Sequence, residues 1–310
     1  MQQRVRDAEE AIAQVYLGHP RAIRQATLTV LSGGHLLIED VPGIGKTTLA
    51  LALARVLDLP FHRIQMTSDM LPADVIGVSV WNPDAREFEF RPGPIFANVL
   101  LVDELNRATP RTQSALLEAM AEGRVSSDGR TLDLPQPYVV LATQNPVEQF
   151  GTFPLPESQL DRFLMRIQLG YPALDDEIEM LQRKRYGHPV DALPSHLSGD
   201  MVLEARAAVD AVTMHPDVAA YIARIVHETR ESPEVLAGVS PRGALALSQV
   251  ARAAAWLDGR DFVTPTDVYD HAISVCAHRL VLAGQEGEHI ASRLQEAVME
   301  RLLEAVPAPI

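Results

Sequence analysis

The sequence predicts an α/β domain built on a mostly parallel β-sheet, followed by an all-helical domain. A buried strand, a glycine-containing loop and a helix follow one another over residues 35–54. Strands and helices then alternate through the first half of the chain, and the second half is helical. Strands that alternate with helices typically form a parallel sheet with helices on both faces. We therefore expect two domains, at residues 1–170 and 171–310.

The loop between the first strand and its helix predicts a binding site for phosphate groups. The strand is the apolar run His35–Glu39, and Gly-Lys-Thr stands at the mouth of a helix rich in Leu and Ala. Glycine lets the backbone approach an anion closely, and the N–H groups and positive dipole end of the helix point at it. The residues that we expect to bind a nucleotide here are Pro42, Gly43, Ile44, Gly45, Lys46, Thr47 and Thr48.

Three residues of this segment bear on how phosphate groups would bind. Lys46 is expected to reach the β- and γ-phosphates, and Thr47 to place its hydroxyl on Mg²⁺. Asp40 stands where the general pattern G-x-x-x-x-G-K-[ST] has its first glycine. A carboxylate near phosphates is unfavourable unless it points away, so the effect of Asp40 on affinity is left open. A chance Gly-Lys-Thr at a helix start is the alternative interpretation.

Composition excludes several classes of protein. The net charge of −14 and pI of about 5.1 argue against nucleic acid as the main partner. Cys276 is the single cysteine, which excludes a disulfide framework, and we expect it to pack as a small apolar residue. The ten histidines form no HExxH motif, which argues against zinc chemistry. The charged N-terminus and the lack of a long apolar run predict a cytoplasmic protein with no membrane span.

The apolar pattern predicts the remaining elements. Asn82-Pro83-Asp84 and Asp128-Gly129 are turn signals, so we expect two β-hairpins around them. Expected strands lie at residues 61–66, 76–81, 87–91, 98–102, 138–143 and 163–169. Expected helices lie at residues 4–17, 23–31, 110–122, 175–186, 199–212, 216–231, 241–258, 265–280 and 288–304, with a short one from Ile95.

Acidic and amide side chains at two strand ends predict a catalytic site. The strand at 98–102 ends in Asp103 and Glu104, and we expect it to lie beside the phosphate-loop strand. Asp103 can hold Mg²⁺ through water, and Glu104 can accept a proton from the attacking water. Asn145 ends the next buried strand and can orient that water. The alternatives are a solvated acidic pair and a turn residue before Pro146.

Two arginines can complete this chemistry. Arg162 lies just before the fifth strand, and Arg242 follows Ser240-Pro241 at the start of a helix in the second domain. Either could neutralise charge on a γ-phosphate. For each, the alternative is a surface ion pair, the commoner fate of an arginine.

Together these residues resemble the AAA+ ATPases, and within them the MoxR family. The resemblance covers nearly the whole chain, and its central motifs are far more specific than a lone phosphate loop. It is carried by the segments Val41–Thr47, Leu101–Ala108, Gln113–Met120, Ala142–Pro146, Leu160–Phe163 and Ser240–Arg242.

The resemblance implies a P-loop AAA+ core with a parallel five-stranded sheet and β-hairpin inserts, followed by an all-helical lid domain. The hairpins look like the helix-2 insert and the pre-sensor-1 hairpin of that clade. It implies Walker A at Lys46-Thr47, Walker B at Asp103-Glu104, sensor 1 at Asn145, an arginine finger at Arg162 and sensor 2 at Arg242.

The resemblance also implies cofactors and partners. Members of the family are hexameric, chaperone-like ATPases that use ATP and Mg²⁺. They often act with a protein that carries a von Willebrand factor A domain, in metal insertion or complex maturation. We therefore expect a homo-oligomer that hydrolyses ATP and remodels protein clients, with the nucleotide bound between the α/β domain and the lid.

Three other functions stay open at this stage. A nucleic-acid motor is one, because replicative helicases share the hairpin inserts, although the acidic charge argues against it. A metal-chelatase motor subunit is the second, since its architecture is close. The third is a nucleotide-gated scaffold without useful turnover, and the presence of both Asp103 and Glu104 argues against it.

Overall fold

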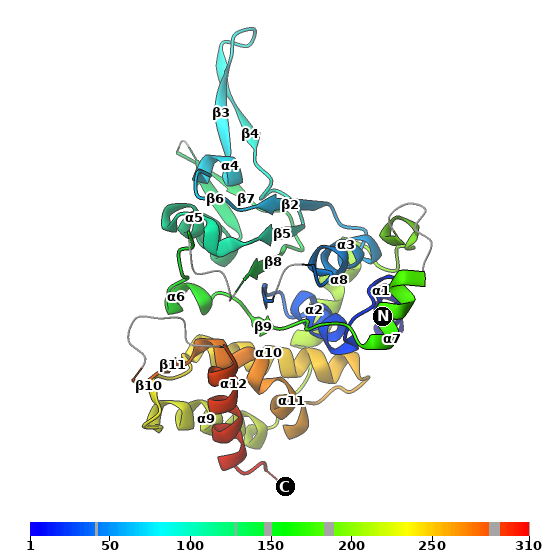
Figure 1. The fold of residues 1–310 in the computed structure, drawn as a ribbon, viewed down its shortest axis with the longest axis vertical. Coiled ribbons are helices and arrows are strands. Elements are labelled where there is room, and N and C mark those ends of the chain that lie inside the picture. The colour runs from blue at the N-terminus through cyan, green and yellow to red at the C-terminus, as the bar shows by residue number, and fades with distance from the viewer. Residues whose placement is uncertain (41–42, 128, 146–150, 183–188, 285–291, 310) are drawn as a thin grey trace.

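The computed structural model describes residues 1–40, 43–127, 129–145, 151–182, 189–284 and 292–309. A five-stranded parallel sheet lies at its centre, with helices on both faces (Figure 1). This confirms the predicted α/β fold. The strands of the sheet, in spatial order, are β2 (Phe61–Gln65), β5 (Val99–Asp103), β8 (Val139–Gln144), β1 (Leu36–Glu39) and β9 (Met165–Ile167).

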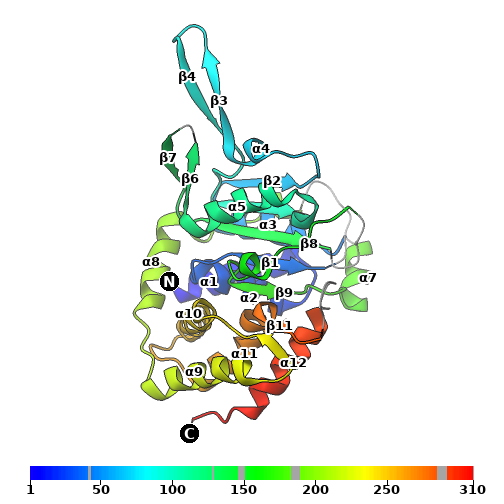
Figure 2. The same cartoon turned by 90° about the vertical axis from the view of Figure 1, so that its left-hand side faces the viewer.

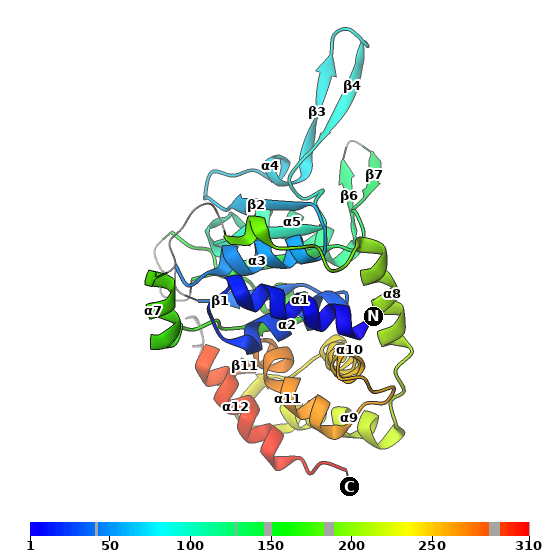
Figure 3. The ribbon, with the colours of Figure 1, turned by 90° about the vertical axis from the view of Figure 1, so that its right-hand side faces the viewer.

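Successive side chains of β1 enter two different hydrophobic cores. Leu36 and Ile38 pack with the helices of one face, and Leu37 packs with those of the other, as the two-residue period of a strand requires. Figure 3 views the first of these faces, and Figure 2 views the second. The first face carries α1 (Gln2–Val15), α2 (Pro20–Leu31) and α3 (Lys46–Val56), and the second carries α4 (Pro72–Ile76) and α5 (Pro110–Glu122).

The strand order corrects one expectation. The strand that ends in Asp103 does not lie beside the phosphate-loop strand, because β8 lies between them and pairs with both. Leu141 of β8 faces Leu36 on one side and Leu101 on the other. The apolar side chains of β8 are buried on both faces of the sheet, which suits a central strand. Order along the chain does not determine this order in space.

Two antiparallel hairpins project from the same side of the molecule (Figures 1 and 3). The longer is formed by β3 (Gly77–Asn82) and β4 (Glu87–Pro92), and the shorter by β6 (Arg124–Ser127) and β7 (Arg130–Asp133). Both hairpins were expected from their turn signals, although Asp128 lies outside the described residues. At the base of the longer hairpin the backbone approaches itself closely, since a Cβ on Gly77 would meet the Arg91 carbonyl oxygen at 2.3 Å. Only glycine fits there.

Two local expectations were wrong. The short helix predicted from Ile95 does not form, because the N–H of the buried Ile95 donates to the Val75 carbonyl, 3.2 Å away. Val75 belongs to α4, a helix that the sequence pattern did not predict. The predicted strand at 163–169 is reduced to β9, since Phe163 and Leu164 form bends instead. A further short helix, α6 (Glu157–Leu160), precedes them.

The second half of the described chain is mainly helical, as expected. It also contains a small two-stranded antiparallel sheet that the pattern did not predict, formed by β10 (Val235–Ala237) and β11 (Val281–Leu282). Parts of two predicted helices, at residues 183–186 and 288–291, lie outside the described residues. The helices are α7 (Leu174–Gln182), α8 (Gly199–Asp210), α9 (Pro216–Glu231), α10 (Pro241–Leu257), α11 (Pro265–Cys276) and α12 (Ser292–Ala305), with 3₁₀ turns η1 (Leu105–Arg107), η2 (Pro189–Ala192) and η3 (Ala277–Arg279).

Proline opens α9, α10 and α11, where its missing N–H costs nothing. Cys276 is fully buried in α11, which confirms its predicted role as a small apolar residue. Burial raises the pKa of its thiol to about 12. Side chains of α8 and α10 join the same core as α1 to α3, so the boundary near residue 170 stays a prediction.

Candidate functional site

The phosphate loop adopts the backbone that its glycines permit. Gly43 and Gly45 both have positive φ values, of 88° and 90°, and α3 begins directly after them at Lys46. Ile44 is buried beneath the loop, whereas Thr47 and Thr48 lie partly exposed in the first turn of α3. Pro42, also predicted to bind, lies outside the described residues. The described part of the loop therefore leads directly into the N-terminus of α3, whose first N–H groups can face a bound anion.

The Asp40 side chain is hydrogen-bonded by the chain that follows β9. Its carboxylate accepts hydrogen bonds from the N–H groups of Leu169 and Gly170, at 2.8 and 2.7 Å, just after β9. Its backbone carbonyl accepts one from Lys46 Nζ, at 2.9 Å. The negative charge that interrupts the general motif is thus balanced by two N–H dipoles of the chain that leaves β9.

Lys46 lies among the acidic residues of the strand ends. Partial burial lowers the pKa of its ammonium group, and the charges of Asp103, Asp40 and Glu104 oppose that shift, in decreasing order. The structure therefore brings Lys46 together with the acidic pair, although β8 separates β1 from β5. An ammonium group that feels the charges of two carboxylates, close to the carboxyl ends of parallel strands, is suited to bind a charged ligand.

Asp103 is buried at the end of β5, and both of its oxygens are occupied. Oδ2 forms a salt bridge with Arg63 Nε at 2.7 Å, and Oδ1 accepts a hydrogen bond from Thr143 Oγ1 at 3.3 Å. Neither partner was predicted. The signal was present for Thr143, because it directly precedes Gln144-Asn145 at the same strand end.

Glu104 follows Asp103 in a left-handed backbone conformation, with φ of 55°. Its N–H donates to Thr143 Oγ1 at 3.0 Å, so one threonine orients both members of the acidic pair. Its carboxylate accepts from Gln65 Nε2 and lies in a salt bridge with Arg107 Nε, each at 2.8 Å. Gln65 faces Asp103 in the register of β2 and β5, which no sequence pattern reports.

Asn145 is buried directly after β8. Since β8 lies between β1 and β5, Asn145 follows the strand between the phosphate loop and the acidic pair. This is the place from which a side-chain amide can reach a water shared by both.

The two arginines lie elsewhere. Arg162 Nη1 donates to the Leu117 carbonyl at 2.7 Å, on α5, whose core is on the opposite face of the sheet from α3. Arg242 is exposed in the first turn of α10, which Ser240 caps. Neither is held beside Lys46 by a contact within the described chain.

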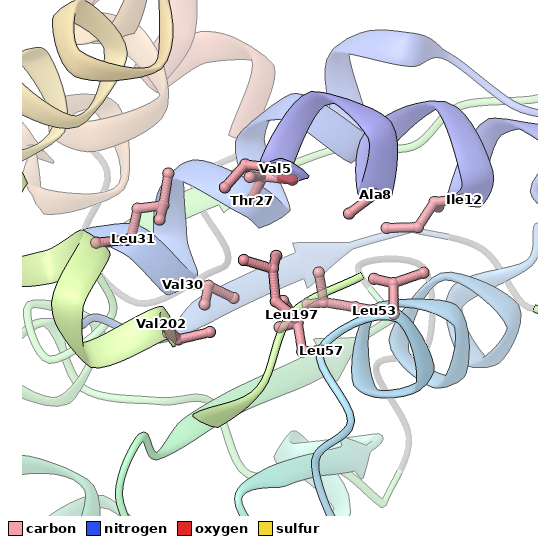
Figure 4. A pocket seen from close by; sticks show the side chains of 12 residues that line it. Val5, Ala8, Ile12, Thr27, Val30, Leu31, Leu53, Leu57, Leu197 and Val202 are labelled. Atoms are coloured by element: carbon pink, nitrogen blue, oxygen red, sulfur yellow. The ribbon is translucent and has the colours of Figure 1, made fainter. Parts of the chain in front are cut away.

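A small apolar cavity lies between α1, α2, α3 and α8 (Figure 4). Its volume is about 20 Å³ and its lining is almost entirely aliphatic, so it is a packing defect and not a nucleotide site. In the part of the chain that the structure covers, no helix combines the length and apolarity that crossing a bilayer demands.

Comparison with known proteins agrees with this geometry. Residues 35–165 match the ATPase family associated with various cellular activities (AAA), and residues 227–300 match the AAA lid domain. YeaC of Bacillus subtilis, a protein without an assigned function, is 43% identical over 98% of this chain and 94% of its own length. Chaperone MoxR1 of Mycobacterium tuberculosis is 39% identical over 96% of this chain and 80% of its own.

A solved structure extends the agreement to the whole fold. A crystal structure from Cytophaga hutchinsonii, provisionally described as an ATPase, aligns with a TM-score of 0.89 at 37% identity and covers 100% of this chain and 96% of that one. Identity of 39% to MoxR1 over nearly full length leaves little room for another family. The chain belongs to the MoxR family of AAA+ ATPases.

Proposed function

We propose that this protein binds ATP with Mg²⁺ and hydrolyses it to ADP and phosphate. The observation that carries the proposal is the meeting of Lys46, at the mouth of α3, with Asp103 and Glu104 at the end of β5. In this proposal residues 1–170 form the nucleotide-binding core and residues 171–310 the lid domain.

The residues present fit a magnesium nucleotide. Oxygen ligands suit Mg²⁺, and the Thr47 hydroxyl and Asp103 carboxylate supply them. When bound, the ion would neutralise charge on the phosphates. The loop residues 42–48 would bind the phosphates, with Lys46 exchanging the Asp40 carbonyl for phosphate oxygens.

Side chains of the protein would carry out the separate steps of hydrolysis. Glu104 accepts the proton of the attacking water, and Thr143 holds its backbone in place. Asn145 orients the water. Gln65 and Arg107 hold the Glu104 carboxylate before the nucleotide arrives, so they determine how readily it can act as a base.

Arginines complete the proposed site. Arg162 lies on the α5 side of the sheet, away from α3, and this favours action on the nucleotide of a neighbouring subunit in a homo-oligomer, which we propose to be a hexamer. Arg242, exposed at the start of α10, is proposed to contact the γ-phosphate in its own subunit.

The proposed work of the ATPase is chaperone-like remodelling of a protein client. Trp81 and Phe88 are 50% and 64% exposed on the long hairpin, where their rings meet edge to face at 5.2 Å. Exposed aromatic side chains on a projecting element suit contact with another protein better than contact with an anionic polymer. A partner with a von Willebrand factor A domain, and a role in metal insertion or complex maturation, are the finer parts of this proposal.

The experiment combines turnover with capture. Purified protein should release phosphate from ATP only with Mg²⁺, and Glu104→Gln should bind ATP without turnover and retain its client in a pull-down. The same variant with Lys46→Ala is the matched control and should retain nothing. Stimulation by DNA that disappears with added salt would instead favour a nucleic-acid motor.

A further inference from the structure

A buried arginine of the lid binds residues on both sides of Arg162 in the chain. The Arg279 side chain is only 3% exposed, and its Nε forms a salt bridge with Asp161 Oδ1 at 2.8 Å. Its Nη2 donates to the Phe163 carbonyl at 2.7 Å, and its Nη1 to the Leu164 carbonyl at 3.3 Å. One guanidinium therefore binds the residue before Arg162 and the two residues after it.

A second side chain of the lid reaches the same carboxylate. Ser240 Oγ donates to Asp161, at 3.3 and 3.2 Å from its two oxygens. Ser240 also caps α10, because its Oγ accepts the Gly243 N–H at 3.2 Å. Arg242 lies two residues further along, so Asp161 is connected to the start of the helix that presents Arg242.

The fit at this place is tight. A Cβ on Gly243 would lie 2.8 Å from Arg279 Cδ, so α10 and Arg279 pack directly against each other. His278, also buried, lies with its Nε2 3.2 Å from the Phe163 carbonyl. The Asp161 carboxylate and the carbonyls of Phe163 and Leu164 are held in this way. Because Nη1 of Arg162 also donates to the Leu117 carbonyl, the Arg162 side chain has little freedom to point in another direction.

We propose that Arg279 and Asp161 are positioning residues that aim Arg162 at the nucleotide of the next subunit, and that Ser240 links this aim to α10. This inference rests on the proposed function of Arg162. It adds that the lid of one subunit controls the position of the Arg162 side chain that acts on the nucleotide of the neighbouring subunit. A nucleotide that draws Arg242 and α10 toward it would move Ser240, and with it the Asp161 carboxylate that precedes Arg162.

A double-variant cycle tests positioning against general stability. Asp161→Asn should lower kcat by about 10- to 100-fold, because small misplacements at a reacting centre have effects of that size. Binding of a fluorescent ATP analogue should change less than about twofold, since Asp161 has no hydrogen bond or salt bridge with the described residues of the phosphate loop. In an Arg162→Ala background the same substitution should lower kcat less than about twofold further, because the group that it positions is gone.

The control is a matched ion pair inside the lid. Arg260 binds Asp267 through two contacts of 2.6 Å and has no contact with residues 161–164. Arg260→Gln should lower the melting temperature but leave kcat within about twofold. Arg279→Lys repeats the cycle, because an ammonium keeps the positive charge but cannot reproduce the planar fork that binds three residues at once. It replaces Asp161→Asn if that variant does not assemble.

The outcomes separate the inference from the function on which it rests. If Asp161→Asn costs the same factor with and without Arg162, or if Arg260→Gln is equally slow, Asp161 is a structural residue and the inference is wrong. If Arg162→Ala alone hydrolyses ATP normally, the assignment of Arg162 is itself wrong. The Ser240→Ala variant should fall between the parent and Asp161→Asn, and Ser240→Thr should restore kcat.

Discussion

The acidic strand ends and Arg162 are built in different ways. Lys46 begins α3, Asp103 ends β5 and Glu104 follows it directly. The order of the strands in one sheet therefore determines how these three residues lie relative to one another. Arg162 follows a four-residue helix, and side chains from the lid hold its surroundings. The difference suggests a nucleotide-binding half that is fixed once the core folds and an arginine whose placement depends on the lid.

The first test of this contrast concerns binding. Lys46→Ala should abolish measurable ATP binding, because the phosphate loop loses the cation expected to face the phosphates. Titration of a fluorescent ATP analogue measures the loss. Lys184→Ala, which removes the only other lysine of the sequence, should bind as the parent does. Equal affinity in Lys46→Ala and the parent would place the nucleotide elsewhere.

The second test concerns turnover in the same half. Glu104→Gln should bind ATP like the parent and lower kcat by up to about 10⁴-fold, because an amide cannot accept the proton of the attacking water. Steady-state phosphate release measures this. Glu122→Gln changes an exposed carboxylate of the same core and should have no effect. Unchanged turnover in Glu104→Gln would point to another base.

The third test concerns Arg162. Arg162→Ala should bind ATP normally and hydrolyse it more slowly, by a factor on the order of 10³ if it acts like other arginine fingers. A phosphate-release assay measures the loss. Full activity in this variant would leave Arg162 as a structural contact of α5.

Mixing of two inactive variants decides whether Arg162 acts on a neighbouring subunit. Arg162→Ala subunits keep Glu104, and Glu104→Gln subunits keep Arg162. In a mixed oligomer some interfaces pair an intact Glu104 with an intact Arg162 of the neighbour, so activity should partly return. If Arg162 acted within its own subunit, every site would lack one group and the mixture would stay inactive.

The smallest expected effect concerns the start of the phosphate-loop strand. The buried His35 accepts the Val140 N–H at Nδ1, so its Nε2 carries the proton that reaches the Met120 carbonyl, with both contacts at 3.1 Å. Burial lowers the pKa of His35 to about 4. Below its ordinary pKa of 6.5 the unfolded chain therefore binds a proton that the folded chain does not, and the free energy of unfolding falls as pH falls.

The size of this effect follows from linkage. His35 should remove about 2 kcal/mol from the free energy of unfolding between pH 7.5 and pH 5. Urea unfolding at both pH values measures it. His35→Gln can keep one acceptor and one donor without titrating, so its pH dependence should be smaller by that amount. An identical dependence in parent and variant would mean that His35 is accessible to protons in the folded state.

The sequence predicted the bounds of helices and strands better than it predicted which strands lie side by side. Helix α5 begins and ends at the predicted residues because Thr109 caps it, Pro110 opens it and Gly123 follows it with φ of 66°. These signals are local. The place of β8 between β1 and β5 depends on packing among distant segments, so the expectation that β1 and β5 are neighbours was wrong.

The residues of the candidate site show the same difference between local motifs and contacts across strands. Lys46, Asp103 and Glu104 were predicted from motifs, and the structure brings them together. Arg63 was missed because its importance arises from a contact across strands, which no short pattern records. Thr143 was missed although it directly precedes Gln144-Asn145, because its contact with Asp103 joins two strands. The hold of Arg279 on the residues around Arg162 joins positions more than a hundred residues apart, and its basis is visible only in three dimensions.

The long hairpin can act as a lever. Six residues in each strand give an arm of roughly 20 Å, so a rotation of about 10° at its base would carry the tip roughly 3 Å. Its base is the close contact of Gly77 with the chain around Gly93, and that chain leads through Ile95 to β5 and the acidic pair. A small shift of the chain at the strand ends would therefore become a larger displacement of Trp81 and Phe88 on the hairpin.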